Sequence, residues 1–191
     1  MNMKFSEKVK LGNKLYKSLK KNLRIGILGG TFDPPHKGHI KISSESKKKY
    51  KLHYIIWAIT KKNPFKKKSS SSLKSRINFA KKITKKQKFI KIKYYEKIIN
   101  SNKTINLINY LKKNNKKLDI YFIIGADNLI NFHKWHKWRS ISKNCNILVF
   151  DREGYRGKAL KSIAYRRLNK RSLSFIKFKK VNISSSQIRK I

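Results

Sequence analysis

Residues 29–39 read Gly-Gly-Thr-Phe-Asp-Pro-Pro-His-Lys-Gly-His, and they decide the fold expected for this chain. The mostly apolar residues 23–28 directly before them predict a buried strand whose carboxyl end turns sharply at Gly29 and Gly30. Glycine accepts backbone angles that other residues avoid, and it lets a ligand approach the main chain closely. The stretch therefore predicts a strand followed by a turn that is open to a bulky polar ligand.

A helix is expected to begin at about Lys37, after the two prolines. His36 and His39 are three residues apart, which places both on one face of its first turn. A helix N-terminus also carries unpaired N–H groups and a positive partial charge. Each feature alone occurs as an ordinary turn or surface histidine, but the combination predicts a binding site for nucleotide phosphates.

The composition of the chain is strongly basic. Its 191 residues favour one domain with a real core, and 51 Lys+Arg against 8 Asp+Glu give a net charge of +43. Such an excess predicts attraction to polyanions. The lysines are nevertheless spread from end to end beside abundant Ile and Asn, which is typical of compositional drift in an A/T-rich genome. We expect weak, salt-sensitive binding of nucleic acid and no specific nucleic-acid partner.

Cys145 is the one cysteine, so neither a disulfide framework nor a thiolate metal site is expected. No stretch has the apolar length of a membrane span, and the basic first residues lack the apolar block of a signal peptide. We therefore expect a cytoplasmic protein without a membrane partner. No pattern in the sequence indicates an oligomeric state.

The chain is expected to consist of a basic N-terminal extension, residues 1–22, and one domain, residues 23–191. The extension is either a short helix or a mobile arm, because its loosely helical pattern is broken by Gly12. Within the domain, apolar runs that predict strands alternate with segments of helical spacing. Further strands are expected at residues 54–59, 89–92, 119–124, 145–150 and 175–178, and helices at 38–49, 73–83, 104–111 and 183–191.

This alternation predicts an α/β fold with a mostly parallel sheet. Right-handed crossovers would place the carboxyl ends of all strands on one edge, where ligands bind in such sheets. Four distant segments would then meet in one cleft, namely residues 29–39, 63–68, 125–128 and 184–189.

Three sequence blocks occur in a particular order along the chain. After residues 29–39, residues 122–129 read Phe-Ile-Ile-Gly-Ala-Asp-Asn-Leu and are followed by Trp135, and residues 182–189 read Asn-Ile-Ser-Ser-Ser-Gln-Ile-Arg. Together they resemble the His-x-Gly-His nucleotidyltransferases, and within them the bacterial nicotinate-nucleotide adenylyltransferases. The resemblance spans nearly all of the domain and implies a Rossmann-like nucleotidyltransferase fold, with helices on both faces of the sheet.

The resemblance implies transfer of AMP from ATP to nicotinate mononucleotide, which gives deamido-NAD and pyrophosphate. Such a transfer needs alignment and charge stabilisation rather than a protein nucleophile. Mg²⁺ would arrive with ATP, because the few carboxylates form no dedicated metal site. Two alternatives remain open: a related adenylyltransferase acting on nicotinamide mononucleotide or phosphopantetheine, and a basic nucleic-acid-binding module on a degenerate transferase scaffold.

The resemblance also implies roles for single residues. His36, His39 and Arg189 are expected to act on the reacting phosphates, and Gly125 and Asp127 to lie at a nucleotide ribose. Further contacts with ATP phosphates are implied for Gly29, Gly30, Thr31, Phe32, Ser184, Ser185 and again Arg189.

The nicotinate ring is expected to stack on Trp135, and its carboxylate to be recognised by Thr104 and the main chain of His136. An ordinary core or surface aromatic remains the alternative for Trp135, and a plain helix cap remains the alternative for Thr104. Rejection of the amide analogue would depend on donors that are left unpaired without a carboxylate.

Overall fold

The computed structural model describes residues 23–62 and 70–176. Within these residues the strands form one sheet in the order β3-β2-β1-β4-β5-β6, and every neighbouring pair is parallel. This confirms the predicted sheet and is the strand order of a doubly wound α/β fold. The strands are β1 (Leu23–Gly30), β2 (Tyr54–Ile59), β3 (Ile90–Lys93), β4 (Leu118–Gly125), β5 (Asn146–Phe150) and β6 (Leu173–Ile176).

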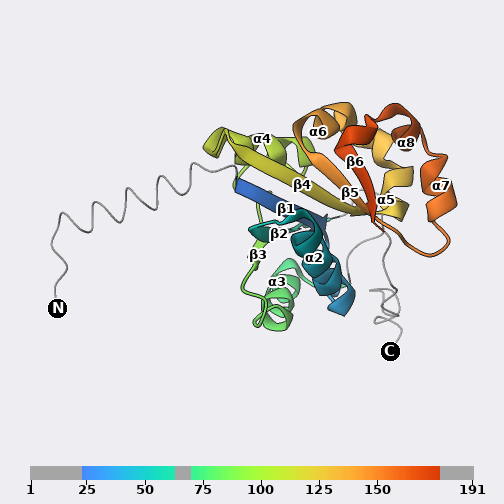
Figure 1. The fold of residues 1–191 in the computed structure, drawn as a ribbon. Coiled ribbons are helices and arrows are strands. Elements are labelled where there is room, and N and C mark those ends of the chain that lie inside the picture. The colour runs from blue at the N-terminus through green and yellow to red at the C-terminus, as the bar shows by residue number, and fades with distance from the viewer. Residues whose placement is uncertain (1–22, 63–69, 177–191) are drawn as a thin grey trace, which may run out of the picture.

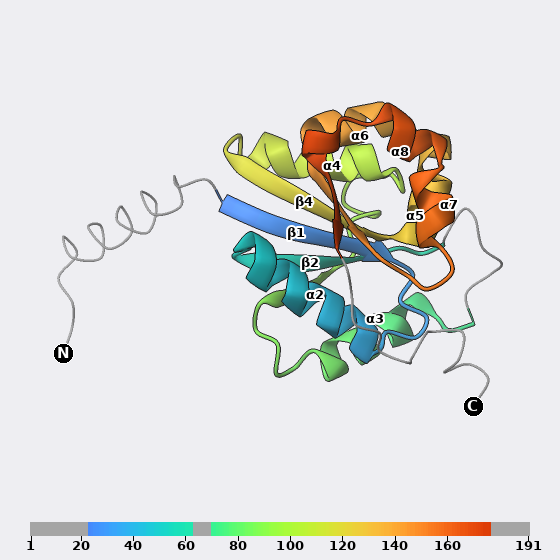
Figure 2. The same cartoon turned by 45° about the vertical axis from the view of Figure 1, so that its right-hand side comes forward.

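Helices cover both faces of this sheet, as Figures 1 and 2 show. One face is covered by α2 (Lys37–Tyr50) and α3 (Leu73–Ile83). The other is covered by α4 (Thr104–Asn114), α5 (Ala126–Ile130), α6 (Trp138–Asn144) and α8 (Ile163–Arg167). The remaining short helices are α7 (Arg156–Leu160), η1 (Phe132–Lys134) and η2 (Lys170–Ser172).

The core is divided by the sheet into two apolar clusters, one on each face. Successive side chains of a strand point to opposite faces. Ile25 and Ile27 of β1 therefore belong to the cluster under α4 to α8, whereas Leu28 belongs to the cluster under α2 and α3. Since both faces are covered, the central strands are apolar along most of their length, which is why they were predictable from sequence.

Several predicted boundaries agree with the structure. Strand β2 and helix α3 begin and end at the expected residues. Ser72 is the N-cap of α3, because its Oγ accepts a hydrogen bond from the Ser75 N–H at 3.1 Å. Helix α4 begins at Thr104 as expected, but its N-cap Lys103 makes no capping bond through its side chain. Thr104 is therefore the first helical residue and not a cap.

The predicted turn at Gly29 and Gly30 is wrong. Both residues continue β1, where they pair with Ala58 and Ile59 of β2, and neither has a positive φ. The bond from the Thr60 N–H to the Gly30 carbonyl, at 2.9 Å, extends this pairing by one residue. The left-handed backbone that was expected of the glycines is instead found at Phe32, with a φ of 50°.

The predictions for residues 1–22, for the basic loop at 63–68 and for a terminal helix at 183–191 lie outside the described residues. Among the helices of the described part, none is long and apolar enough to cross a membrane.

Candidate active site

The two histidines of the first motif cap helix α2. His36 is the N-cap residue, and its Nδ1 accepts from the Gly38 N–H at 3.1 Å. His39 returns the bond, because its Nδ1 accepts from the His36 N–H at 3.2 Å. This is a capping box built from imidazoles, with the two ring centroids 3.9 Å apart. It holds both rings side by side at the carboxyl end of β1.

The capping bonds also fix where the protons lie. A neutral imidazole whose Nδ1 accepts a hydrogen bond carries its proton on Nε2. Burial, and secondarily the positive charge of Arg152, lower the pKa of His36 to about 4. His36 is therefore neutral at pH 7, with Nε2–H as its remaining donor. The same Nδ1 bond favours an Nε2–H donor on His39 when that ring is neutral.

The stacked rings of Phe32 and Trp57 pack against His39. The rings of Phe32 and Trp57 are stacked with centroids 4.8 Å apart, and the His39 ring lies 4.9 Å from the first and 5.8 Å from the second. Trp57 Nε1 donates to Ser43 Oγ at 2.8 Å, and that hydroxyl donates to the His39 carbonyl at 2.8 Å. The Phe32 side chain is thus part of the core, which leaves its main chain for any contact with phosphate.

The loop between β1 and α2 is fastened to the start of α3 by Asp33. This carboxylate is buried and accepts from the Ser70 N–H at 2.7 Å, from the Ser71 N–H at 3.2 Å and from Ser70 Oγ. Burial alone would raise the pKa of Asp33, but the bonds from Ser70 and Ser71 outweigh it and lower that pKa below its ordinary value. The motif contained Asp33, but its spacing alone gave no hint of this partner.

A second wall of the site lies at the end of β4. Gly125 is the N-cap residue of α5, and a Cβ at that position would overlap the Asp127 carboxylate. Asp127 pairs with Arg152 at 2.9 Å. The positive charge of Arg152 also helps to lower the pKa of His36, so the Arg152–Asp127 ion pair acts on the imidazole at the end of β1. Asp127 was predicted for this site, whereas Arg152 was missed and is signalled only by its place just past β5.

Trp135, which was expected at the nicotinate ring, packs against the core cluster on the other face of the sheet. Trp135 is half-buried against Phe132 and Phe122, at centroid distances of 5.1 and 6.0 Å. A Cβ built on Gly29 would lie 3.8 Å from the Phe122 ring, so the Phe122 ring lies between Trp135 and Gly29 of β1. His136 is exposed.

Some of the predicted groups are not tested by these contacts. Ser184, Ser185 and Arg189 lie outside the described residues. Thr104 is half-buried at the start of α4. Among residues 23–62 and 70–176, no three His, Cys, Asp or Glu side chains are grouped so that they could hold a metal ion.

The family to which these features belong is decided by comparison with known proteins. The family model described as cytidylyltransferase-like matches residues 27–191. A probable nicotinate-nucleotide adenylyltransferase of Pelagibacter ubique is 67% identical over 171 residues, which cover 90% of this chain and 94% of that protein. The chain belongs to the nicotinate-nucleotide adenylyltransferase family. A second such relative, from a Ruegeria species, is 35% identical and is aligned over 75% of this chain and 76% of its own length.

Solved structures of nicotinic acid mononucleotide adenylyltransferases share the fold. The Plasmodium falciparum protein, solved in complexes with APC and with NaAD, matches 88% of this chain and 83% of its own with a TM-score of 0.70 at 20% identity. A putative nicotinate-nucleotide adenylyltransferase from Vibrio parahaemolyticus matches with a TM-score of 0.62 at 18% identity, over 88% of this chain and 85% of its own. The predicted Rossmann-like nucleotidyltransferase fold is thereby confirmed.

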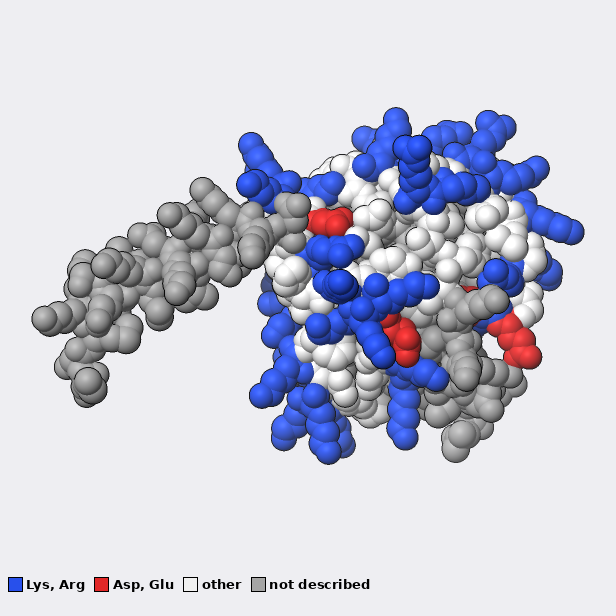
Figure 3. All heavy atoms as spheres, in the orientation of Figure 1, with Lys and Arg blue, Asp and Glu red and all other residues white. Residues whose placement is uncertain are grey.

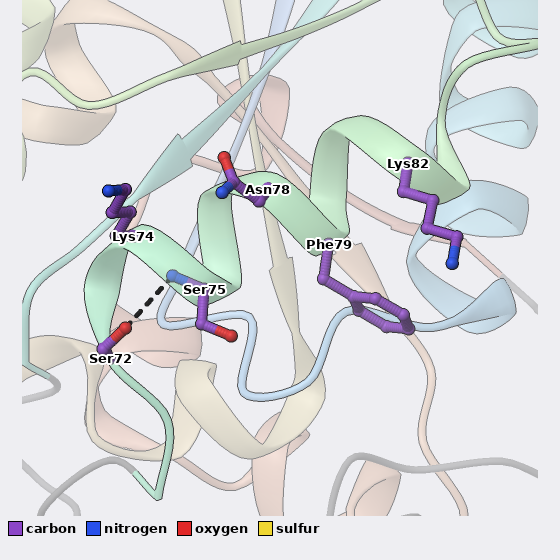
Figure 4. A pocket seen from close by; sticks show the side chains of 6 residues that line it. All are labelled: Ser72, Lys74, Ser75, Asn78, Phe79 and Lys82. Carbon is purple, nitrogen blue, oxygen red and sulfur yellow. Dashed lines mark hydrogen bonds between the residues drawn. The ribbon is translucent and has the colours of Figure 1, made fainter.

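A separate depression lies on the outer surface of α3, with the exposed Phe79 ring on one side (Figure 4). Its polar groups include Ser72, whose hydroxyl is already engaged by the N-cap bond to Ser75. None of its lining residues belongs to the predicted adenylyltransferase site. The lining residues are Ser72, Lys74, Ser75, Asn78, Phe79 and Lys82.

Proposed function

We propose that this chain transfers AMP from ATP to nicotinate mononucleotide, forming deamido-NAD and releasing pyrophosphate. The observation that carries the proposal is the imidazole capping box, which holds the neutral His36 beside His39 at the N-terminus of α2. A helix N-terminus with such donors is suited to phosphate oxygens. The names of the family's relatives supply the second substrate.

The chemistry requires alignment more than covalent help. The mononucleotide phosphate attacks the α-phosphorus of ATP, and the bond from this phosphorus to the oxygen that bridges it to the β-phosphorus breaks, so that pyrophosphate leaves. His36 and His39 donate from Nε2 to oxygens on which charge develops, and the main chain at residues 29–32 donates to the phosphates. Because these donors are fixed beforehand by packing and capping, they need no reorganisation during the reaction.

Charged groups complete the phosphate site in this proposal. Arg152 pairs with Asp127, and its charge acts on His36, so its guanidinium offers a cation at the same sheet edge. Asp127, kept in place by the small Gly125, binds a ribose hydroxyl. Ser184, Ser185 and Arg189 hold the triphosphate and the leaving pyrophosphate, on the strength of their sequence block.

The acidic substrate is recognised on the β4 side of the site. Trp135 stacks on the pyridine ring, while Thr104 and the main chain of His136 donate to the nicotinate carboxylate. The half-buried indole, which lies against Phe122, supports this arrangement. Donors that face a carboxylate are left unpaired by a carboxamide, which is the physical basis for rejecting nicotinamide mononucleotide.

ATP binds as its Mg²⁺ complex. Since the described residues offer no cluster of metal ligands, the phosphates and water supply most of the Mg²⁺ coordination. A cytoplasmic location and the absence of a membrane partner remain predictions, as does the division of the chain at residue 22.

The charge on the face drawn in Figure 3 does not favour the nucleic-acid alternative. Figure 3 shows Lys and Arg spread widely over this face, without one basic stripe. Spread charge of this kind produces salt-dependent binding without sequence preference. We therefore retain only weak, nonspecific binding of nucleic acid.

The proposal is tested by incubating the purified full chain with Mg-ATP and nicotinate mononucleotide, and by following deamido-NAD and pyrophosphate. Both products should form in equal amounts. Adenylylation of phosphopantetheine without adenylylation of either pyridine mononucleotide would refute the assignment.

A further inference from the structure

Arg76 is a buried arginine whose guanidinium, within the described residues, hydrogen-bonds main-chain carbonyls alone. It lies on the inner side of α3 with 3% of its surface exposed. Its Nη1 donates to the carbonyls of Thr31 and, at 2.9 Å, Thr60; its Nη2 donates to Lys61 at 3.1 Å, and its Nε to Ser71 at 3.2 Å. One side chain thus joins three segments: the residue that follows β1, the two residues that follow β2, and the residues that precede α3.

A guanidinium is suited to this position in a way that lysine is not. Buried charge is costly unless hydrogen bonds satisfy it, and the planar fork of arginine offers five donors in fixed directions. Burial lowers the pKa of Arg76, while the nearby carboxylates of Asp33 and Glu96 act in the opposite direction. Arginine nevertheless stays charged at neutral pH. Its binding of four carbonyls therefore depends on geometry as well as charge.

The contact with Thr31 determines the direction of a neighbouring donor. The Thr31 carbonyl and the Phe32 N–H belong to one planar trans peptide, so they point in opposite directions. Arg76 holds the carbonyl toward α3, which turns the N–H of Phe32 away from α3. Within residues 23–62 and 70–176, no acceptor is bound to this N–H.

The backbone at Phe32 needs such support. Its φ of 50° lies in the left-handed region, which is unfavourable for a residue that carries a Cβ. A strained residue persists only where its surroundings hold it. Arg76 holds the peptide on one side of Phe32 and Asp33, bound by Ser70 and Ser71, holds the residue on the other. The Phe32 ring is fixed by its stack on Trp57.

We propose that Arg76 is a positioning residue for ATP: it orients the Thr31–Phe32 peptide so that the Phe32 N–H is presented to the ATP phosphates. The inference rests on the proposed function. Arg76 does not touch substrate in this account, and it acts through the Thr31 carbonyl. Loss of the fork should therefore weaken the use of ATP while leaving the nicotinate subsite intact.

The test compares Arg76→Met with Arg24→Met. Arg76 acts at the carboxyl end of β1, whereas Arg24 lies at the amino end of β1 and binds the side chains of Tyr121 and Asp119. For Arg76→Met, we expect kcat/KM for ATP to fall by about 10²-fold, as for a small misplacement of a binding group. The KM for nicotinate mononucleotide should be unchanged. Arg24→Met should lower the Tm and leave both KM values unchanged.

A second variant decides the matter if Arg76→Met does not fold. Arg76→Lys keeps the charge but cannot bind four carbonyls, so the KM for ATP should still rise while that for nicotinate mononucleotide does not. Calorimetric binding of α,β-methylene-ATP should weaken in parallel. A rate that falls only with the folded fraction, with KM and analogue binding for ATP unchanged, would overturn the role of Arg76. A wild-type chain that binds the analogue but does not adenylylate the mononucleotide would instead refute the proposed function.

Discussion

The two ends of strand β1 are both fastened by an arginine, and they differ in what that arginine binds. At the amino end, Arg24 donates to the Tyr121 hydroxyl, lies 3.4 Å from the Asp119 carboxylate and covers the Tyr121 ring. At the carboxyl end, the hydrogen bonds of Arg76 to described residues all go to carbonyls, including that of Thr31. At the amino end, side chains bind one another. At the carboxyl end, Arg76 binds main-chain carbonyl acceptors, and in our proposal the neighbouring N–H donors bind a ligand.

The polarity of a parallel sheet explains this difference. Every strand of the described sheet ends on the same edge, and α2 and α5 begin there. Because Arg76 holds the Thr31 carbonyl at this edge, the N–H group of the same peptide points the opposite way, toward the proposed phosphate site. An arginine at each end of β1, Arg24 within the strand and Arg76 from α3, thus stabilises the fold at one end and, in our proposal, organises phosphate binding at the other.

The largest effect is expected from the histidine at the carboxyl end. His39→Ala removes an Nε2 donor and the cap on the His36 N–H, so turnover should fall by about 10²- to 10³-fold or more. His53→Ala is the matched control, because His53 accepts from the Arg24 N–H at the amino end. Steady-state rates of both variants, with Tm values to verify folding, would measure the contrast. Near-normal turnover of His39→Ala would remove the core of the mechanism.

A smaller effect is expected from the second wall of the site. Gly125→Ala places a Cβ against the Asp127 carboxylate and forces it to move, so kcat/KM should fall by roughly tenfold, which corresponds to about 1.4 kcal/mol. Gly157→Ala is the control, since a Cβ there meets nothing within 4 Å. Equal activity of the two variants would show that the position of Asp127 is not used in the reaction.

The smallest effect concerns the pKa of His36, which NMR titration should place at about 4. Arg152→Gln should raise this pKa only part of the way toward its ordinary value of 6.5, because burial is the larger cause of the lowering. The pKa of the folded state lies below the ordinary value of 6.5, so the unfolded chain binds the extra proton between these pH values. The free energy of unfolding should therefore decrease as the pH falls from about 6.5 toward 4. An ordinary His36 pKa in the folded chain would contradict the buried, capped ring.

Much of the fold was predictable because its signals are local. The apolar run of β2 and the serine cap of α3 identify these elements without knowledge of their neighbours. The predicted turn at Gly29 and Gly30 failed because pairing with β2, a contact distant in sequence, carries the strand further. In the site, the spacing of His36 and His39 was informative because capping is local.

Arg76 was not predictable in the same way. It is one of 51 basic residues, and its four acceptors come from three segments that only the folded chain brings together. One signal was available: Arg76 lies three residues after Leu73 and four before Ala80, on the apolar stripe of α3. A charged residue on such a stripe requires hydrogen-bonding partners in the core.

In the proposed function, ATP and an acidic pyridine mononucleotide react at the edge where the strands of the sheet end. The decisive measurement is kcat/KM for nicotinate mononucleotide and for nicotinamide mononucleotide, with the same full-length protein and saturating Mg-ATP. We predict that the acid is adenylylated much faster than the amide, because the amide leaves carboxylate-binding donors unpaired. Equal rates, or a preference for the amide, would contradict the account.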